Sequence, residues 1–190
     1  MALNKMVDMV EHQVIAAVRH EEELGKVAAS RVNVVFLMTG TIGNLHLLVN
    51  QIKDSGRRVF IHMDFIEGIA SDRSGVHYIA TELKPDGILT TRSHLIGMAK
   101  ENGLMAIQRL FLIDSTAIRN GLKAVNSSGA DAVEIMPGVM PKVIHELTEK
   151  TDLPIIAGGL IRSEEEVMEA LEAGALAVSV GSETLWQMQL

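Results

Sequence analysis

The sequence predicts one domain over residues 1–190, an α/β protein whose eight parallel strands close into a compact (β/α)8 barrel of the TIM type. Three observations lead to this prediction. Short apolar runs recur along the whole chain, amphipathic stretches separate them, and the connections between the two are short. Eight such units favour closure over an open doubly wound parallel sheet, which is the alternative, although 190 residues is slightly short for a barrel.

Composition indicates a globular protein with an aliphatic core. Hydrophobic residues make up 47% of the sequence and aromatic residues only 3%, so Val, Ile, Leu, Ala and Met must fill the interior. The absence of cysteine excludes disulfides and thiolate metal sites. No apolar run reaches the roughly 18 residues of a membrane span, and no signal-peptide core is visible. We therefore expect a cytoplasmic protein with no membrane contact. The net charge of −7 argues mildly against nucleic-acid binding.

The first half of the chain contains four of the predicted strands. An amphipathic helix over residues 1–12 precedes the first strand, and Asn44 is a candidate cap for a later helix. A polar loop over residues 64–74 follows the third strand. The predicted strands are 14–18, 32–38, 58–63 and 87–90, and the predicted helices after them are 21–29, 44–56, 76–83 and 93–103.

The second half contains the other four strands, with clearer helix starts. Residues 154–157 form an apolar run of the kind that is buried on both faces of a parallel sheet. Ser163 and Glu166 have the spacing of a capping box, and Pro141 suits the first position of a helix. The predicted strands are 104–109, 131–135, 154–157 and 175–180, and the helices after them are 114–129, one from 141, 163–174 and a short one around Trp186.

Glycine follows each of the last two strands. Gly158 and Gly159 end the seventh strand, and Gly181 and Ser182 end the eighth. The loops after strands seven and eight of such a barrel are its usual phosphate-binding place, and glycine lets an anion approach backbone N–H groups. We therefore predict a phosphate site at these four residues. The alternative is that the glycines only turn the chain.

Arginines fall at or just beyond several strand ends, whereas lysines lie mostly on helices or near the opposite end. We expect Arg92 or Arg109 to neutralise a ligand's phosphate. The alternative is that these arginines pair with Asp64, Glu67 and Glu134 in a structural network. The arginines expected at the strand-end face are Arg19, Arg73, Arg92, Arg109 and Arg162.

Polar side chains near the third and sixth strand ends complete the candidate site. His62, Asp64 and Glu67 favour contacts with ligand hydroxyl groups over a metal site, with a carboxylate-bound magnesium ion as the alternative. We predict no cofactor. His62, Asp64 and Glu134 could serve as acids or bases, but no lysine ends a strand and no nucleophile–base pair is apparent, so the catalytic set is thin.

One apolar segment stands where a polar loop is expected. Leu110, Phe111, Leu112 and Ile113 follow the fifth predicted strand directly. Such a segment either packs under the next helix, which we favour, or forms a subunit contact in a homodimer.

Six segments of the chain have a recognisable sequence, namely 59–68, 84–88, 91–93, 108–115, 134–138 and 154–161. Together they resemble a known family, the glycerol-3-phosphate-responsive antiterminators that regulate glycerol-uptake operons. The sequence departs from this family in the loop over residues 38–44, where Thr41 stands in place of the expected acidic residue.

The resemblance implies a barrel that binds glycerol 3-phosphate and a leader mRNA, and that prevents transcription termination without acting as an enzyme. On this basis we predict that Arg19, Arg73 and Arg162 contact RNA, with the loop over residues 64–74 closing on the ligand to present Arg73. The alternatives are an isomerase or lyase that acts on a phosphorylated metabolite, and a ligand-binding barrel that signals through a protein partner.

Overall fold

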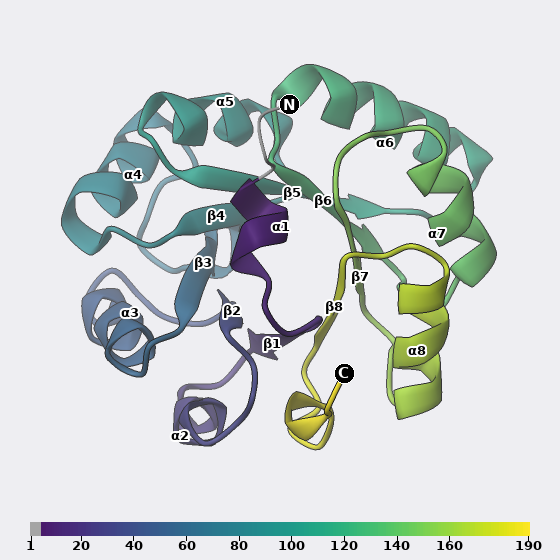
Figure 1. Ribbon diagram of the computed structural model, residues 1–190. Helices are drawn as coiled ribbons and strands as arrows, with labels where there is room; N and C mark the ends of the chain where they lie inside the picture. The colour runs from purple at the N-terminus through teal and green to yellow at the C-terminus, as the bar shows by residue number, and fades with distance from the viewer. Residues whose placement is uncertain (1–4) are drawn as a thin grey trace.

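The computed structural model describes residues 5–190, in which the strands form a closed parallel barrel (Figure 1). The strands pair in chain order, and β8 returns to β1 with Val14 opposite Val178, which confirms the barrel over the open sheet. The strands are β1 (Val14–Val18), β2 (Val34–Leu37), β3 (Arg58–His62), β4 (Gly87–Thr90), β5 (Met105–Phe111), β6 (Ala132–Met136), β7 (Ile155–Gly158) and β8 (Ala177–Val180).

Helices surround the barrel, except that α1 lies across the centre of the ring of strands (Figure 1). Short 3₁₀ turns occur at Glu21–Glu23, Met63–Phe65 and Leu185–Gln187, the last of which holds Trp186. The helices are α1 (Lys5–Met9), α2 (Leu24–Ala28), α3 (Leu45–Asp54), α4 (Arg73–Tyr78), α5 (Ser93–Glu101), α6 (Ser115–Ser128), α7 (Pro141–Thr148) and α8 (Glu164–Glu172).

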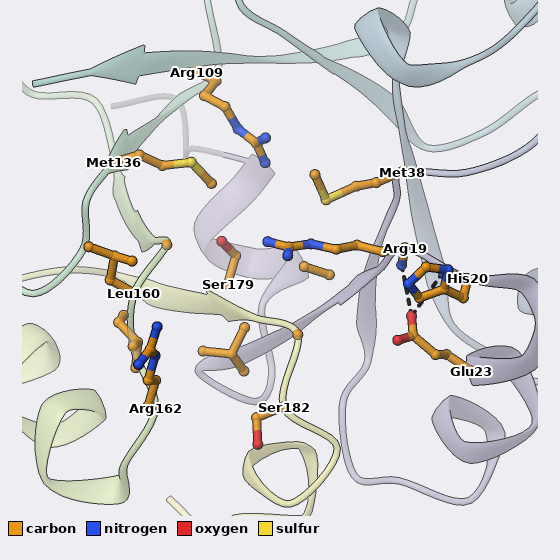
Figure 2. A pocket seen from close by; sticks show the side chains of 15 residues that line it. Arg19, His20, Glu23, Met38, Arg109, Met136, Leu160, Arg162, Ser179 and Ser182 are labelled. Atoms are coloured by element: carbon orange, nitrogen blue, oxygen red, sulfur yellow. Dashed lines mark hydrogen bonds between the residues drawn. The ribbon is translucent and has the colours of Figure 1, made fainter.

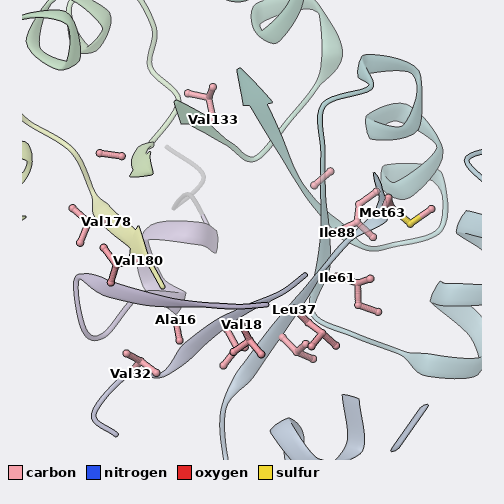
Figure 3. Packing of buried hydrophobic residues seen from close by; sticks show 14 of the residues in the cluster. Ala16, Val18, Val32, Leu37, Ile61, Met63, Ile88, Val133, Val178 and Val180 are labelled. Atoms are coloured by element: carbon pink, nitrogen blue, oxygen red, sulfur yellow. The ribbon is translucent and has the colours of Figure 1, made fainter. Parts of the chain in front are cut away.

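Each strand contributes to two cores because its successive side chains point to opposite faces. Outward-pointing aliphatic residues pack under the helices, as Figure 3 shows for Val18, Leu37 and Ile61. Inward-pointing residues fill the barrel itself and include the aromatic pair Phe36 and Phe60. Met6 of α1 belongs to this inner cluster and closes the amino-terminal end of the barrel, which leaves the carboxyl end for function.

The predicted N-terminal helix over residues 1–12 is too long. Residues 1–4 lie outside the described part of the chain, and α1 ends at Met9. Asn33 Nδ2 donates to the Met9 carbonyl at 2.8 Å, so a side chain from the residue before β2 takes the acceptor that a longer helix would use. Val7, in the middle of α1, is 47% exposed.

The predicted helix over residues 76–83 begins three residues too late. Asp72 accepts a hydrogen bond from the Gly75 N–H at 2.9 Å and so caps α4, which begins at Arg73. The chain continues as a π-helical turn over Ile79–Leu83 before Lys84. The loop after β3 is therefore shorter than predicted. In contrast, the capping box of Ser163 and the first-turn position of Pro141 are confirmed.

The apolar segment at the end of β5 divides into a packed half and an exposed half. The strand continues to Phe111, so side chains alternate. Leu112 is buried, and Leu110 packs on α6 at Gly121, where an added Cβ would lie 2.8 Å from Leu110 Cδ1. Phe111 is 57% exposed and Ile113 is 85% exposed. The prediction that the segment packs under the helix holds for Leu110 and Leu112 only.

Candidate functional site

A layer of buried polar side chains lies inside the carboxyl end of the barrel. Each member stands two positions after an inward-pointing apolar residue of its own strand, so it faces the same way. All four side chains are at most 3% exposed. We call this set the polar layer, and it consists of His62 on β3, Arg109 on β5, Glu134 on β6 and Ser179 on β8.

Glu134 anchors this layer. One of its carboxylate oxygens accepts a hydrogen bond from Arg109 Nε at 2.5 Å, and the other accepts one from Ser179 Oγ at 2.5 Å. Burying a carboxylate requires such compensation. Both oxygens are therefore engaged, and the sequence-based alternative of a structural network is realised between Arg109 and Glu134.

Arg109 also has a nitrogen that the network leaves without a partner. Its Nη2 atom is buried and has no hydrogen-bond partner among residues 5–190. A buried N–H group on a cation is costly when it is unpaired. Figure 2 shows the guanidinium of Arg109 pointing into a pocket at the barrel mouth, so an anionic group there would complete its hydrogen bonding.

The pocket is a cavity of about 480 Å³ between the ends of β7 and β8 and those of β1 and β2. This volume is within the range of small-molecule sites. Of the predicted phosphate residues, Gly159, Gly181 and Ser182 line it. The other lining residues are Ala17, Arg19, His20, Glu23, Met38, Arg109, Met136, Leu160, Ile161, Arg162, Ser179 and Val180.

Two further arginines of the cavity are free to bind an anion. The backbone N–H groups of Arg19 and Arg162 donate to Glu23 and Glu166, at 2.7 and 2.6 Å, which fixes the loops that carry them. Among the arginines of the described chain, these two alone have no side-chain hydrogen bond or ion pair. The cavity thus combines three guanidinium groups with glycine loops, and arginine is well suited to bind an anion such as phosphate.

The three predicted glycines have three different structural roles. Gly159 has a φ of 76° and is followed by Leu160 with a φ of 65°, so the β7 loop needs glycine for its left-handed turn. Gly181 faces open space, because the nearest atom to an added Cβ is the Ala17 oxygen at 3.7 Å. Gly158 does not line the cavity; its absent Cβ leaves room for Ser179 and Glu134.

The other predicted site residues lie outside the cavity. Arg92 pairs with Asp64, whose Oδ1 lies 3.4 Å from Arg92 Nε, and Glu67 is exposed in the loop after β3. Arg73 pairs with Glu101 at 2.5 Å and lines a separate groove between α4 and α5. Arg73 therefore does not line the mouth cavity, and its predicted contact with RNA stays a prediction.

Asp64 is held as a carboxylate by the residues after β4. Burial raises the pKa of Asp64, but hydrogen bonds from the backbone and side chain of Thr91 outweigh this and hold the pKa below its ordinary value. Thr90 Oγ1 donates to the second oxygen at 3.1 Å. With its oxygens occupied, Asp64 connects the ends of β3 and β4 rather than facing the cavity.

His62 is buried as a neutral ring. Burial, and then the charge of Arg109, lower the pKa of His62 to about 3. Although Nδ1 lies 3.8 Å from Asp64 Oδ2, this low pKa means that the contact is not an ion pair at neutral pH. Neither ring nitrogen has a hydrogen-bond partner among the described residues, and the ring packs edge-on against Phe65, with centroids 4.5 Å apart.

We expect His62 to make the fold sensitive to acid. Its pKa in the folded protein lies below the ordinary 6.5, so the folded state binds fewer protons and loses stability as pH falls below 6.5. A His62→Leu variant has no group that loses stability in this way. As the pH falls from about 6 to 4, the difference in free energy of unfolding between the variant and the wild type should therefore shift in favour of the variant by about 1.4 kcal/mol per pH unit. Urea unfolding at several pH values tests this, and parallel pH profiles for the two proteins would contradict it.

The described residues 5–190 contain no group of three His, Cys, Asp or Glu side chains placed to hold a metal ion. Over the same residues, no helix has both the length and the apolar character needed to cross a membrane.

Comparison with known proteins identifies the family. The sequence profile of the family described as glycerol-3-phosphate responsive antiterminator matches residues 14–186. The chain belongs to this family. The resemblance noted in the sequence is thereby confirmed, and the match to this family of regulators covers nearly the whole chain.

Two solved structures and one curated relative extend this finding. The glycerol uptake operon antiterminator regulatory protein of Listeria monocytogenes has a TM-score of 0.89 and 32% identity, over 93% of this chain and 95% of that one. A glycerol uptake operon antiterminator-related protein of Thermotoga maritima has a TM-score of 0.83 and 34% identity, over 92% of this chain and 98% of that one. The uncharacterized protein YgcP of Escherichia coli is 34% identical over 94% of this chain and 93% of its own length.

Sequence reasoning missed some residues of the cavity, notably Ser179, Met38 and Met136. The alternation of side chains contained a signal for Ser179, which stands two positions before Gly181 on the same strand face. The sequence alone does not predict that Ser179 donates a hydrogen bond to Glu134.

Proposed function

We propose that this chain is an antitermination regulator that binds glycerol 3-phosphate in the mouth cavity and, in response, binds a leader mRNA. The observation that carries the ligand assignment is the guanidinium group of Arg109, which points into the cavity and whose buried Nη2 atom has no hydrogen-bond partner among the described residues. Family membership supports the regulatory role.

In this proposal the phosphate lies between the β7 and β8 loops. Gly159, Gly181 and Ser182 offer backbone N–H groups, and Arg19 and Arg162 supply charge from opposite sides of the cavity. Because these two arginines have no other partner, their attraction for the dianion does not compete with an existing ion pair. Arg109 supplies a third positive charge to the anion from the polar layer at the cavity wall.

No observation favours the enzyme alternative. The two carboxylates that could serve as a base, Glu134 and Asp64, both have their oxygens occupied by hydrogen bonds from the protein. A general base must reach a substrate proton directly or through one water. We therefore give these residues the role of holding Arg109 and the β3–β4 connection in place.

Gly181→Ala should weaken ligand binding without harming the fold. The added methyl group meets no atom closer than 3.7 Å, so it fits, yet it stands at the cavity wall and keeps an oxygen away from the backbone. We expect glycerol 3-phosphate affinity to fall about tenfold, which corresponds to about 1.4 kcal/mol. Calorimetry measures this, and glycerol without phosphate is the control ligand. An unchanged affinity would place the phosphate elsewhere.

The function as a whole is tested by a gel shift. A leader transcript of a glycerol-uptake operon should bind more tightly with glycerol 3-phosphate than without it, and RNA should raise ligand affinity by the same factor. Binding of the ligand without any RNA binding would instead favour a barrel that signals through a protein partner.

A further inference from the structure

The barrel mouth has a second surface beside the cavity, over β3, β4 and β5. These strands are neighbours in the barrel, whereas the cavity lies mainly over the other strands. Phe65 follows β3, Arg92 follows β4, and Phe111 and Ile113 lie at and after the end of β5. We call these four residues the mouth platform. It therefore alternates an aromatic ring, a guanidinium group and a second aromatic ring along three adjacent strand ends.

The platform exposes three large apolar side chains. Phe65 is 52% exposed, Phe111 is 57% exposed and Ile113 is 85% exposed. The other two phenylalanines, Phe36 and Phe60, are fully buried in the barrel. In a chain with only 3% aromatic residues, two exposed rings at one end of the barrel indicate a binding surface.

We propose that the mouth platform binds a single-stranded segment of the leader mRNA, with bases stacked on Phe65 and Phe111 and a backbone phosphate held by Arg92. This inference rests on the proposed function and names the surface that performs it. Exposed aromatic rings interleaved with arginine are the usual means of holding unpaired bases. Arg92 thereby moves from the ligand, where the sequence suggested it, to the RNA.

The charges of the platform are compatible with RNA. Asp64 is the carboxylate nearest to Arg92, and its oxygens already accept hydrogen bonds from Thr90 and Thr91. Asp114, next to Ile113, caps α6 by accepting from the Ala117 N–H at 2.7 Å. The side chain of Arg92 remains 51% exposed, so it can reach a phosphate while it stays beside Asp64.

The platform and the cavity are connected through the polar layer. Arg109 stands two residues before Phe111 on β5, and its charge acts on His62, whose ring packs against Phe65. An anion bound by Arg109 is thus held by β5, the strand that ends in Phe111. The charge of Arg109 also acts on His62, whose ring supports Phe65. This arrangement gives ligand and RNA a physical route for the mutual effect that linkage requires.

The test uses aromatic-to-leucine changes, because leucine keeps an apolar side chain but removes the flat ring. Anisotropy of a labelled leader transcript should show that Phe65→Leu and Phe111→Leu each weaken RNA binding about tenfold, while Phe111→Tyr stays near the wild type. Met168→Ala, on α8 away from the platform, is the control for loss of an exposed apolar side chain. Glycerol 3-phosphate affinity should stay unchanged without RNA in every variant.

The outcomes separate this inference from the proposed function. If both leucine variants bind the RNA as tightly as the wild type does, the mouth platform is not the RNA-binding surface. The proposed function would still hold in that case. If Phe111→Ala loses RNA binding but Phe111→Leu keeps it, the side chain makes an apolar contact, such as a subunit interface. This result would also overturn the proposal that bases stack on Phe111. If the wild type binds no leader RNA with or without the ligand, the proposed function and the platform both fail.

Discussion

Arg109→Met is expected to destabilise the fold and to abolish ligand binding together. Methionine replaces the stem of the arginine but leaves Glu134 buried without its cation, which typically costs about 3–5 kcal/mol. The same change removes the N–H groups that face the cavity. We expect glycerol 3-phosphate affinity to fall by at least about 30-fold, since losing one partner of a buried charged pair costs about 2 kcal/mol or more. Urea unfolding and calorimetry measure the two effects.

A second variant separates the structural role of Arg109 from its binding role. In the double variant Arg109→Met, Glu134→Gln the buried charge is gone, and the new amide oxygen can still accept from Ser179. We expect this protein to regain most of the stability that Arg109→Met loses, because no unpaired charge remains. Ligand binding should stay absent. A double variant that binds glycerol 3-phosphate as the wild type does would show that Arg109 serves only to neutralise Glu134.

The barrel could be predicted from sequence because its determinants are local. Parallel strands buried on both faces appear as apolar runs, and helix starts such as Ser163 with Glu166 depend on neighbouring residues only. The end of α1 could not be predicted in this way. It depends on Asn33, a residue of the next strand–helix unit, whose side chain binds the Met9 carbonyl.

The candidate site was predictable in part for a similar reason. The rule that function collects at the carboxyl ends of barrel strands brought Arg19, Arg109 and Arg162 together correctly. It did not show that Arg73 stays outside the cavity, because this depends on an ion pair with Glu101 of a neighbouring helix and on the helix start that Asp72 caps. The separation of these residues in the sequence does not predict either contact.

The glycines of the β7 loop show the same limit at the level of single atoms. Gly158 and Gly159 are identical in the sequence, and both were expected to hold a phosphate. In the structure one permits close packing in the polar layer and the other permits a left-handed turn. Only Gly159 lines the cavity. The role of the missing Cβ at Gly158 is set by atoms of β6 and β8, namely Glu134 Oε1 and Ser179 Oγ, which the local sequence does not reveal.

Gly158→Ala is therefore expected to have a much larger effect on folding than Gly181→Ala. The new Cβ would lie 2.5 Å from Ser179 Oγ and 2.8 Å from Glu134 Oε1, so these buried groups must move. Overpacking of this kind typically costs about 1–3 kcal/mol, and ligand affinity should fall as well because Glu134 positions Arg109. Removing the hydroxyl with Ser179→Ala in the same protein should restore part of the stability. Gly181→Ala, whose methyl group fits, should unfold within about 0.5 kcal/mol of the wild type. Equal stabilities for the two glycine variants would mean that the polar layer tolerates the displacement and that Glu134 is not held as tightly as we infer.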